Sequence, residues 1–172
     1  MRVPYKHNTF YDFYVKRFEC IELANYGNFS CSVQLKNRTT SYIQFDYVPN
    51  VDVISLSVNN VMYYRFGTIY RKFMISVKED FCGFFKGKSS PYLSLSWPSL
   101  QKHSNFESGC PFKKGTHYYV KDYVIDSSKY PAGLPTGVYR IDMTLIVNNT
   151  EILLGKNYLE IRRRPFADIM WN

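Results

Sequence analysis

Ser108-Gly-Cys-Pro-Phe-Lys-Lys-Gly-Thr-His-Tyr-Tyr119 joins a cysteine, a basic turn bounded by proline and glycine, and the aromatic start of a strand. We interpret such an element as one that fixes the base of a strand to an earlier segment through a disulfide. Most of the remaining sequence carries strand signals at short, regular intervals. The stretch therefore predicts a disulfide-framed sandwich of β-sheets.

The composition also favours strands. The chain has 172 residues and contains 16 Tyr, 13 Phe and 2 Trp, so that 18% of it is aromatic. Aromatic side chains bury large areas and suit the pleated surface of a sheet. A chain of this length can bury about 70% of its unfolded surface as a single domain. We expect an all-β fold with one substantial core.

Alternation of apolar and polar residues predicts strands that each bury one face. It is found over 28–36, 43–47, 73–77, 118–125 and most regularly 139–147. The Asn59-Asn60 and Asn148-Asn149 pairs are predicted to be hairpin turns, because asparagine tolerates positive φ.

The segment 83–110 interrupts this alternation with glycine, serine and proline. One short helix is expected near residues 99–104. An insertion of this length in a compact domain is usually functional or a lid. We therefore expect it to contribute to the function.

Cysteines and glycosylation motifs together indicate a secretory route. The cysteines are Cys20, Cys31, Cys82 and Cys110, and the N-x-Ser/Thr motifs predict glycosylation at Asn28, Asn37 and Asn148. Both features suit an oxidising compartment. The N-terminus carries no apolar run typical of a signal peptide, and no run is long enough to span a membrane. We expect a secreted, extracellular mature domain whose signal peptide has been removed.

The net charge of +8 favours anionic partners such as lipid headgroups or sulfated glycans. Secretion argues against nucleic acid. The basic groups Lys113-Lys114 and Arg162–Arg164 are most often solvated faces. In a functional interpretation they would attract an anionic membrane surface, and salt would weaken the attraction.

Motifs for catalysis are incomplete. The Gly83–Ser89 stretch has three residues between its glycines, where a phosphate-binding loop requires four. The His103-Ser104 pair has no acid placed to orient the histidine and no Gly-x-Ser-x-Gly turn. We expect no enzyme activity, no catalytic residue and no cofactor.

A set of ordered motifs resembles the ML (lipid-recognition) superfamily, which includes sterol-transfer and ganglioside-activator proteins. The motifs are Cys110-Pro111, Lys113-Lys114-Gly115, Tyr118-Tyr119 and Gly137-Val138-Tyr139-Arg140-Ile141. A narrower set is similar to the insect CheB-like branch of secreted chemosensory proteins: Arg17-Phe18-Glu19-Cys20, Asp80-Phe81-Cys82, His103-Ser104-Asn105-Phe106 and Cys110-Pro111-Phe112.

The resemblance spans about residues 12–163. It implies a single domain over 1–172, with an insertion at 83–110 and a tail at 164–172. The implied fold is an immunoglobulin-like two-sheet sandwich, an ML-like cup whose sheets splay at one edge to admit a hydrophobic ligand. The chain departs from the superfamily because it lacks the cysteines of a terminal bridge and has a longer interval between Cys82 and Cys110. The second departure leaves the pocket entrance and the ligand class open.

We pair Cys20 with Cys31 and Cys82 with Cys110, one of three possible connectivities, because each pair brackets a single hairpin or excursion. In the chain-entropy model, a disulfide that closes a loop of this size stabilises the folded state by roughly 3–4 kcal/mol. A metal site is disfavoured, since there is no C-x2-C pair and only three histidines are present.

The implied function is binding of a lipid or other hydrophobic small molecule, with a contact semiochemical as one candidate. The predicted ligand-binding residues are Phe45, Tyr47, Phe73, Ile75, Val77, Tyr139, Ile141, Met143 and Leu145. A carrier predicts a cavity above roughly 300 Å3. The alternative is an extracellular interaction module with a filled core, whose basic surface binds a receptor or a sulfated glycan. Periodicity does not distinguish a hollow core from a filled one.

Overall fold

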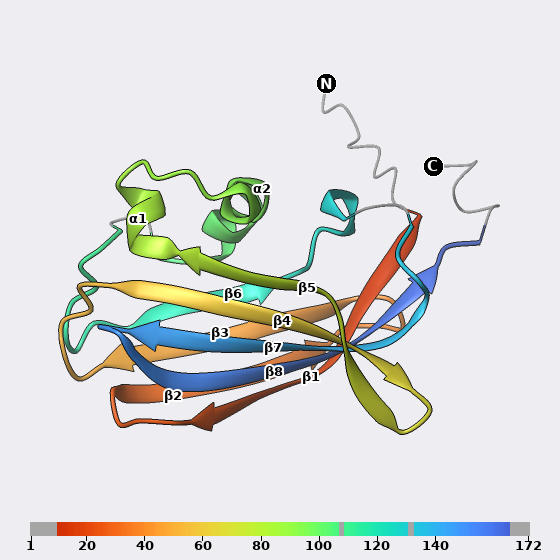
Figure 1. Cartoon of the computed structure of the whole chain (residues 1–172), viewed down its shortest axis with the longest axis horizontal. Helices are drawn as coiled ribbons and strands as arrows, with labels where there is room; N and C mark the ends of the chain where they lie inside the picture. The colour runs from red at the N-terminus through yellow and green to blue at the C-terminus, as the bar shows by residue number, and fades with distance from the viewer. Residues whose placement is uncertain (1–9, 107–108, 131–132, 166–172) are drawn as a thin grey trace.

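The computed structural model describes residues 10–106, 109–130 and 133–165, without the side chains of residues 74 and 75. Two antiparallel sheets form a sandwich (Figure 1), so the predicted all-β two-sheet fold is confirmed. One sheet has the order β1-β8-β7-β4-β5, and the other has the order β2-β3-β6. The bounds in chain order are β1 Tyr11–Glu22, β2 Gly27–Leu35, β3 Ser41–Pro49, β4 Leu56–Phe66, β5 Ile69–Asp80, β6 Tyr118–Tyr123, β7 Gly137–Val147 and β8 Thr150–Arg163.

Helices follow β5 on the side of the small sheet's last strand. They are α1 Phe81–Phe85, α2 Pro91–Leu100 and the 3-10 turn η1 Gln101–His103, and a further turn η2 (Ser127–Lys129) follows β6. The side chain of Asp80 accepts a hydrogen bond from the Gly83 N–H at 2.8 Å and so caps α1. This bond lowers the pKa of Asp80. The expectation of one short helix near 99–104 is confirmed in part: the end of α2 and η1 cover residues 99–103, but helical structure already begins at Phe81.

The predicted disulfide pairing is confirmed. Cys20 and Cys31 are joined with their Cα atoms 5.5 Å apart, and Cys82 and Cys110 with theirs 5.4 Å apart. We expected the first bridge to bracket a hairpin. It does not close a hydrogen-bonded hairpin, because β1 and β2 are edge strands of different sheets. It therefore joins the two sheets along one edge. The second bridge ties α1 to the segment that leads into β6.

One of the two predicted asparagine turns is present. Asn148 and Asn149, with φ of 48° and 65°, connect β7 to β8. Asn59 and Asn60 instead lie inside β4, where they pair with β5 and β7 on both sides. This pairing outweighs the turn preference of asparagine. The chain turns directly after Phe66, the last residue of β4, at Gly67-Thr68.

The predicted glycosylation sites differ in what their side chains do. Asn28 and Asn37 are exposed, and the Asn37 side chain closes its own turn by accepting from the Thr39 and Thr40 N–H groups. The Asn148 amide is half-buried; it accepts from the N–H groups of Ile54 and Ser55 and donates to the Asp52 carbonyl. Glycosylation stays a prediction at all three positions.

The core contains two clusters of buried side chains. One is filled and lies where β7 begins; its most buried members are Tyr139, Leu159 and Ile161, exposed by 1% or less. The Tyr139 hydroxyl donates to the Pro135 carbonyl at 2.7 Å, and burial raises the pKa of this phenol to about 12. The second cluster extends from the other half of the sandwich to α1 and α2 and surrounds a cavity. Among the described helices, none is long and apolar enough to cross a membrane.

Candidate ligand-binding cavity

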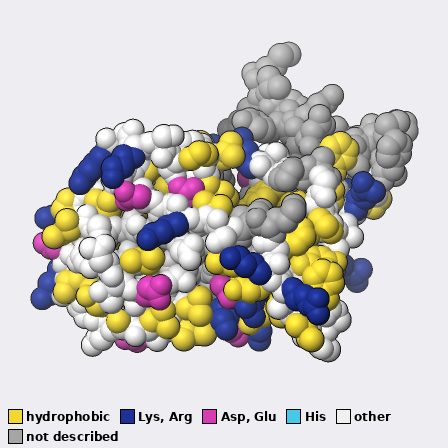
Figure 2. Space-filling model, in the orientation of Figure 1, with side chains coloured by type: hydrophobic (Ala, Val, Ile, Leu, Met, Phe, Trp, Pro, Cys, Tyr) yellow, Lys and Arg dark blue, Asp and Glu magenta, His cyan; other side chains and the backbone are white. Residues whose placement is uncertain are grey.

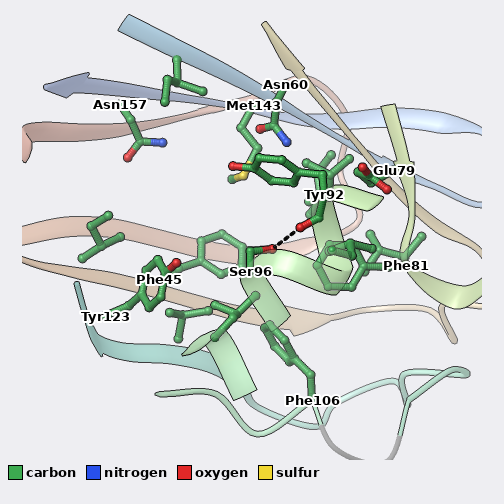
Figure 3. Close-up of a pocket in the computed structure, with 18 of the residues that line it drawn as sticks. Phe45, Asn60, Glu79, Phe81, Tyr92, Ser96, Phe106, Tyr123, Met143 and Asn157 are labelled. Carbon is green, nitrogen blue, oxygen red and sulfur yellow. Dashed lines mark hydrogen bonds between the residues drawn. The ribbon is translucent and has the colours of Figure 1, made fainter. Parts of the chain in front are cut away.

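A cavity of about 240 Å3 lies between the two sheets and the helical insertion (Figure 3). This is smaller than the roughly 300 Å3 that we predicted for a carrier. Its wall is largely apolar and is drawn from every layer of the molecule. The residues are Phe18, Ile43, Phe45, Tyr47, Leu56, Val58, Asn60, Glu79, Phe81, Tyr92, Leu93, Ser96, Leu100, Phe106, Phe112, Tyr118, Val120, Tyr123, Ile125, Tyr130, Ile141, Met143, Leu145 and Asn157.

The inner face of the large sheet forms one wall. β7 contributes Ile141, Met143 and Leu145, which face the same way because side chains alternate along a strand. Val58 lies directly opposite Leu145 on β4, and Asn60 lies directly opposite Met143. The period of two that predicted these strands therefore also sets the cavity wall.

The small sheet and the insertion close the other side. Figure 3 shows Phe45 and Tyr123 across the cavity from Met143. The large sheet has five strands and the small sheet has three, so β3 and β6 do not cover the whole inner face. Tyr92 and Leu93 of α2 line the part of the cavity beside β5. α2 thus takes the place of a further strand.

Tyrosine hydroxyls provide uncharged hydrogen-bonding groups in the cavity wall. The hydroxyls of Tyr92 and Tyr130 lie 3.2 Å apart and share a hydrogen bond. Burial raises the pKa of Tyr123 to about 12 and raises that of Tyr130 as well. These phenols therefore stay protonated at physiological pH, and they offer hydrogen bonds rather than charges to a ligand.

Glu79 places a carboxyl group at the edge of the cavity. The residue is 6% exposed, and the backbone N–H of Tyr92 hydrogen-bonds to it in the first turn of α2. Desolvation raises the pKa of Glu79 despite this bond. The carboxyl group thus holds the start of α2 against β5.

We predict that Glu79 makes the protein less stable as the pH rises. A raised pKa means that the folded state binds the proton more tightly than the unfolded state, so this contribution is full below the unfolded pKa of 4.5 and is lost as pH rises through the folded value. Glu79→Gln should remove this part of the pH dependence. The measurement is the difference in melting temperature between wild type and E79Q from pH 4 upward; a difference that does not change with pH would contradict the assignment.

The structure brings together five of the nine predicted ligand-binding residues. Phe45, Tyr47, Ile141, Met143 and Leu145 line the cavity. The other four, Phe73, Ile75, Val77 and Tyr139, are not among the residues that line the cavity.

Phe73 and Tyr139 pack against one another in the filled cluster, with ring centroids 5.7 Å apart. Val77 lies in a shallow groove beside the start of α2, and the side chain of Ile75 lies outside the described residues. Ligand contact stays a prediction for all nine.

The insertion was expected to contribute to the function, but neither its cavity-lining side chains nor the polar wall residues were predicted. Tyr92, Leu93 and Leu100 lie in the insertion, where no strand alternation indicates which side chains are buried. Asn60 was assigned to a turn, and Asn157 carries no motif. Its place on the inner face follows from its pairing with Ile141 on β7.

The fold and its largely apolar cavity define a two-layer β-sandwich with room for a small ligand. Residues 58–141 match a family described as "Protein of unknown function (DUF1091)". No curated protein matches the sequence.

Among solved structures, the chain is similar to chicken MD-1 complexed with lipid IVa, with 15% identity over 90% of this chain and 99% of that chain and a TM-score of 0.46. It is also similar to a Niemann-Pick type C2 protein from Japanese carpenter ant, with 14% identity over 81% of this chain and 95% of that chain and a TM-score of 0.39. Likenesses at this level name no ligand for this chain.

Proposed function

We propose that the protein is a secreted, ML-type lipid-recognition protein of the CheB-like branch that binds one lipid or other hydrophobic ligand between its sheets. The observation that carries the proposal is the largely apolar cavity between Met143 on β7, Phe45 on β3 and Leu93 on α2. Contact semiochemicals are the ligand class that we favour. The two disulfides support an oxidising compartment.

Burial of hydrocarbon supplies the affinity in this proposal. Each buried methylene contributes about 0.8 kcal/mol, so about ten would give roughly 8 kcal/mol before the cost of ordering the ligand. Binding in the micromolar range or weaker is therefore expected. No step of this function needs a catalytic group.

The direct test is native mass spectrometry with lipid extraction of protein secreted from eukaryotic cells, together with titration of a fluorescent long-chain probe. We expect a bound ligand and saturable probe binding. Met143→Trp should abolish probe binding because the ring fills the cavity, whereas Ile146→Trp adds the same ring to the opposite face of β7 and should not. Protein that is always empty and binds no long-chain probe would refute the proposal.

A membrane surface is the partner that we propose, with the β4–β5 hairpin as the contact. This hairpin extends past the small sheet at the lower right of Figure 1. Along the inner face of β4 the side chains emerge from the core, from Met62 at 5% exposed, through half-buried Tyr64, to Phe66 at 55%. Ile69, which is 59% exposed, lies directly opposite Phe66.

The cations of the hairpin suit anionic headgroups. Arg65, Arg71 and Lys72 are exposed and form no ion pair with any described residue, and the Arg71 guanidinium lies 5.9 Å from the centre of the Phe66 ring. Arg162 and Arg164 of the predicted basic group are instead paired with Glu160 and Asp12.

Figure 2 shows Lys and Arg side chains beside hydrophobic ones at this lower right corner, and elsewhere on that face they are scattered. An apolar tip flanked by unpaired cations matches the interface of an anionic membrane. A flat patch for a sulfated glycan would not need the apolar tip.

We predict that the hairpin binds vesicles of phosphatidylserine and phosphatidylcholine in equal parts. Each removed cation should weaken binding roughly fivefold, so Arg71→Gln with Lys72→Gln has a large effect, and added salt should act in the same direction. Ile69→Ser should also weaken binding, because it removes the inserted side chain. Flotation of the protein with the vesicles measures the binding of wild type and of each variant.

The matched controls are Ile54→Ser, which removes an isoleucine that is 68% exposed elsewhere, and Lys113→Gln with Lys114→Gln. Vesicle binding that survives the hairpin variants, or is lost in the controls, would contradict the assignment.

A further inference from the structure

Asn157 is a polar side chain on an apolar wall. It lies on β8, directly opposite Phe18 of β1 on one side and Ile141 of β7 on the other. Its Oδ1 atom is buried and has no hydrogen-bond partner among the described residues. The residue lines the cavity, and Figure 3 shows it on the same side as Met143 and Asn60.

Asn60 repeats this arrangement on the other side of β7. It lies opposite Met143, and no hydrogen bond of its amide is found among the described residues. The two asparagines are offset by two strands and two residues, which places them about 12 Å apart by the ordinary spacings of a sheet. They therefore bracket the Ile141–Met143 part of the wall.

The other polar groups of the cavity are satisfied within the protein. The Tyr92 and Tyr130 hydroxyls bond to each other, and the Ser96 hydroxyl donates to the Tyr92 carbonyl at 3.1 Å. The Glu79 carboxyl group is hydrogen-bonded by the Tyr92 N–H. Asn157 Oδ1 differs from these groups because it is buried and no described residue donates a hydrogen bond to it.

A buried amide oxygen without a partner destabilises a protein, and an apolar residue of similar size would avoid this cost. We propose that the ligand supplies the missing partner: it is a functionalised hydrocarbon with a hydroxyl group part way along its body, and this hydroxyl donates to Asn157 Oδ1. Asn60 can bond to a second polar group further along the same ligand. The inference rests on the proposed function and narrows its ligand class from hydrocarbons in general to internal alcohols.

The test compares probes of one chain length: a linear alkane, the alcohol with a mid-chain hydroxyl, and the ketone at the same carbon. Displacement of a bound fluorescent probe gives their relative affinities. The alcohol should bind on the order of tenfold more tightly than the alkane, because it satisfies a buried acceptor. The ketone should gain less, since it can accept a hydrogen bond from the Asn157 amide N–H group but leaves Oδ1 without a donor.

Asn157→Leu and Asn157→Val should abolish the preference for the alcohol, measured as the ratio of the alcohol and alkane affinities within each variant. The ligand-free variants should also melt at a higher temperature than wild type, because the orphaned oxygen is gone. Met143→Leu is the control, since it alters the same wall without changing a polar group, and it should keep the preference.

Equal binding of alkane and alcohol would overturn the inference, and so would preference for the ketone or an alcohol preference that persists in both Asn157 variants. Each of these outcomes leaves the proposed function standing, because the alkane still binds. If none of the probes binds, the proposed function itself fails.

Discussion

Replacement of Cys82 and Cys110 by serine is expected to lower the free energy of unfolding by about 3.5 kcal/mol. The bridge closes a loop with a sequence separation of 28 residues, and the loss is the chain entropy that the unfolded state regains. This is a large part of the 5–15 kcal/mol typical of a folded domain. Urea denaturation followed by circular dichroism measures it.

The same change should weaken ligand binding. The bridge holds α1, and α1 leads directly into the loop before α2, whose side chains close the cavity. Replacement of Cys20 and Cys31 is the matched control: it should cost about 3 kcal/mol for its shorter loop but leave α2 in place. Equal loss of affinity in both variants would show that the second bridge has no particular role at the cavity.

Leu93→Ala is expected to destabilise the protein by about 3 kcal/mol. Leu93 is 3% exposed and is the buried residue of α2, so its side chain anchors the helix over the cavity. Truncation both enlarges the cavity and loosens its cover. Ligand affinity should therefore fall together with the midpoint of denaturation.

Leu95→Ala is the control for this prediction. Leu95 belongs to the same helix but is 52% exposed, so its truncation should change stability by no more than about 0.5 kcal/mol. If the two alanine variants behave alike, α2 does not pack against the sandwich as described.

Strand alternation was enough to predict most of the sandwich, because each strand buries only one face. It missed β1, whose buried Tyr11, Phe13 and Val15 do alternate but are followed by a run of charged residues. It also misplaced the hairpin at Asn59-Asn60. A local preference for turns says nothing about the partners that β5 and β7 provide on either side.

The insertion was harder to predict because its prolines suggested loops. Pro91 instead occupies the first turn of α2, where its missing N–H has no cost, and Pro98 lies close to the C-terminal end of the helix. Leu93, Trp97 and Leu100 do follow a helical spacing, which is the signal that could have revealed the helix.

The candidate site was predicted only in part, because alternation shows which face of a strand is inward but not where along that face a cavity lies. Period two identifies which face of β7 is inward, and hence Ile141, Met143 and Leu145. It does not reveal where along that strand the opposing sheet leaves space, so Tyr139 on the same face lies in the filled cluster. Hollow and filled stretches of one strand face have the same pattern.

The placement of α2 outside both hydrogen-bonded ladders has an evolutionary consequence. Substitutions in this helix change the shape of the cavity without disturbing the strand register, since no strand pairs with the backbone of α2. Related chains can therefore diverge in chemical preference while sharing one scaffold. For the proposed ligand-binding function, residues 91–100 are therefore the positions where substitutions can change ligand preference with the least effect on the sheets.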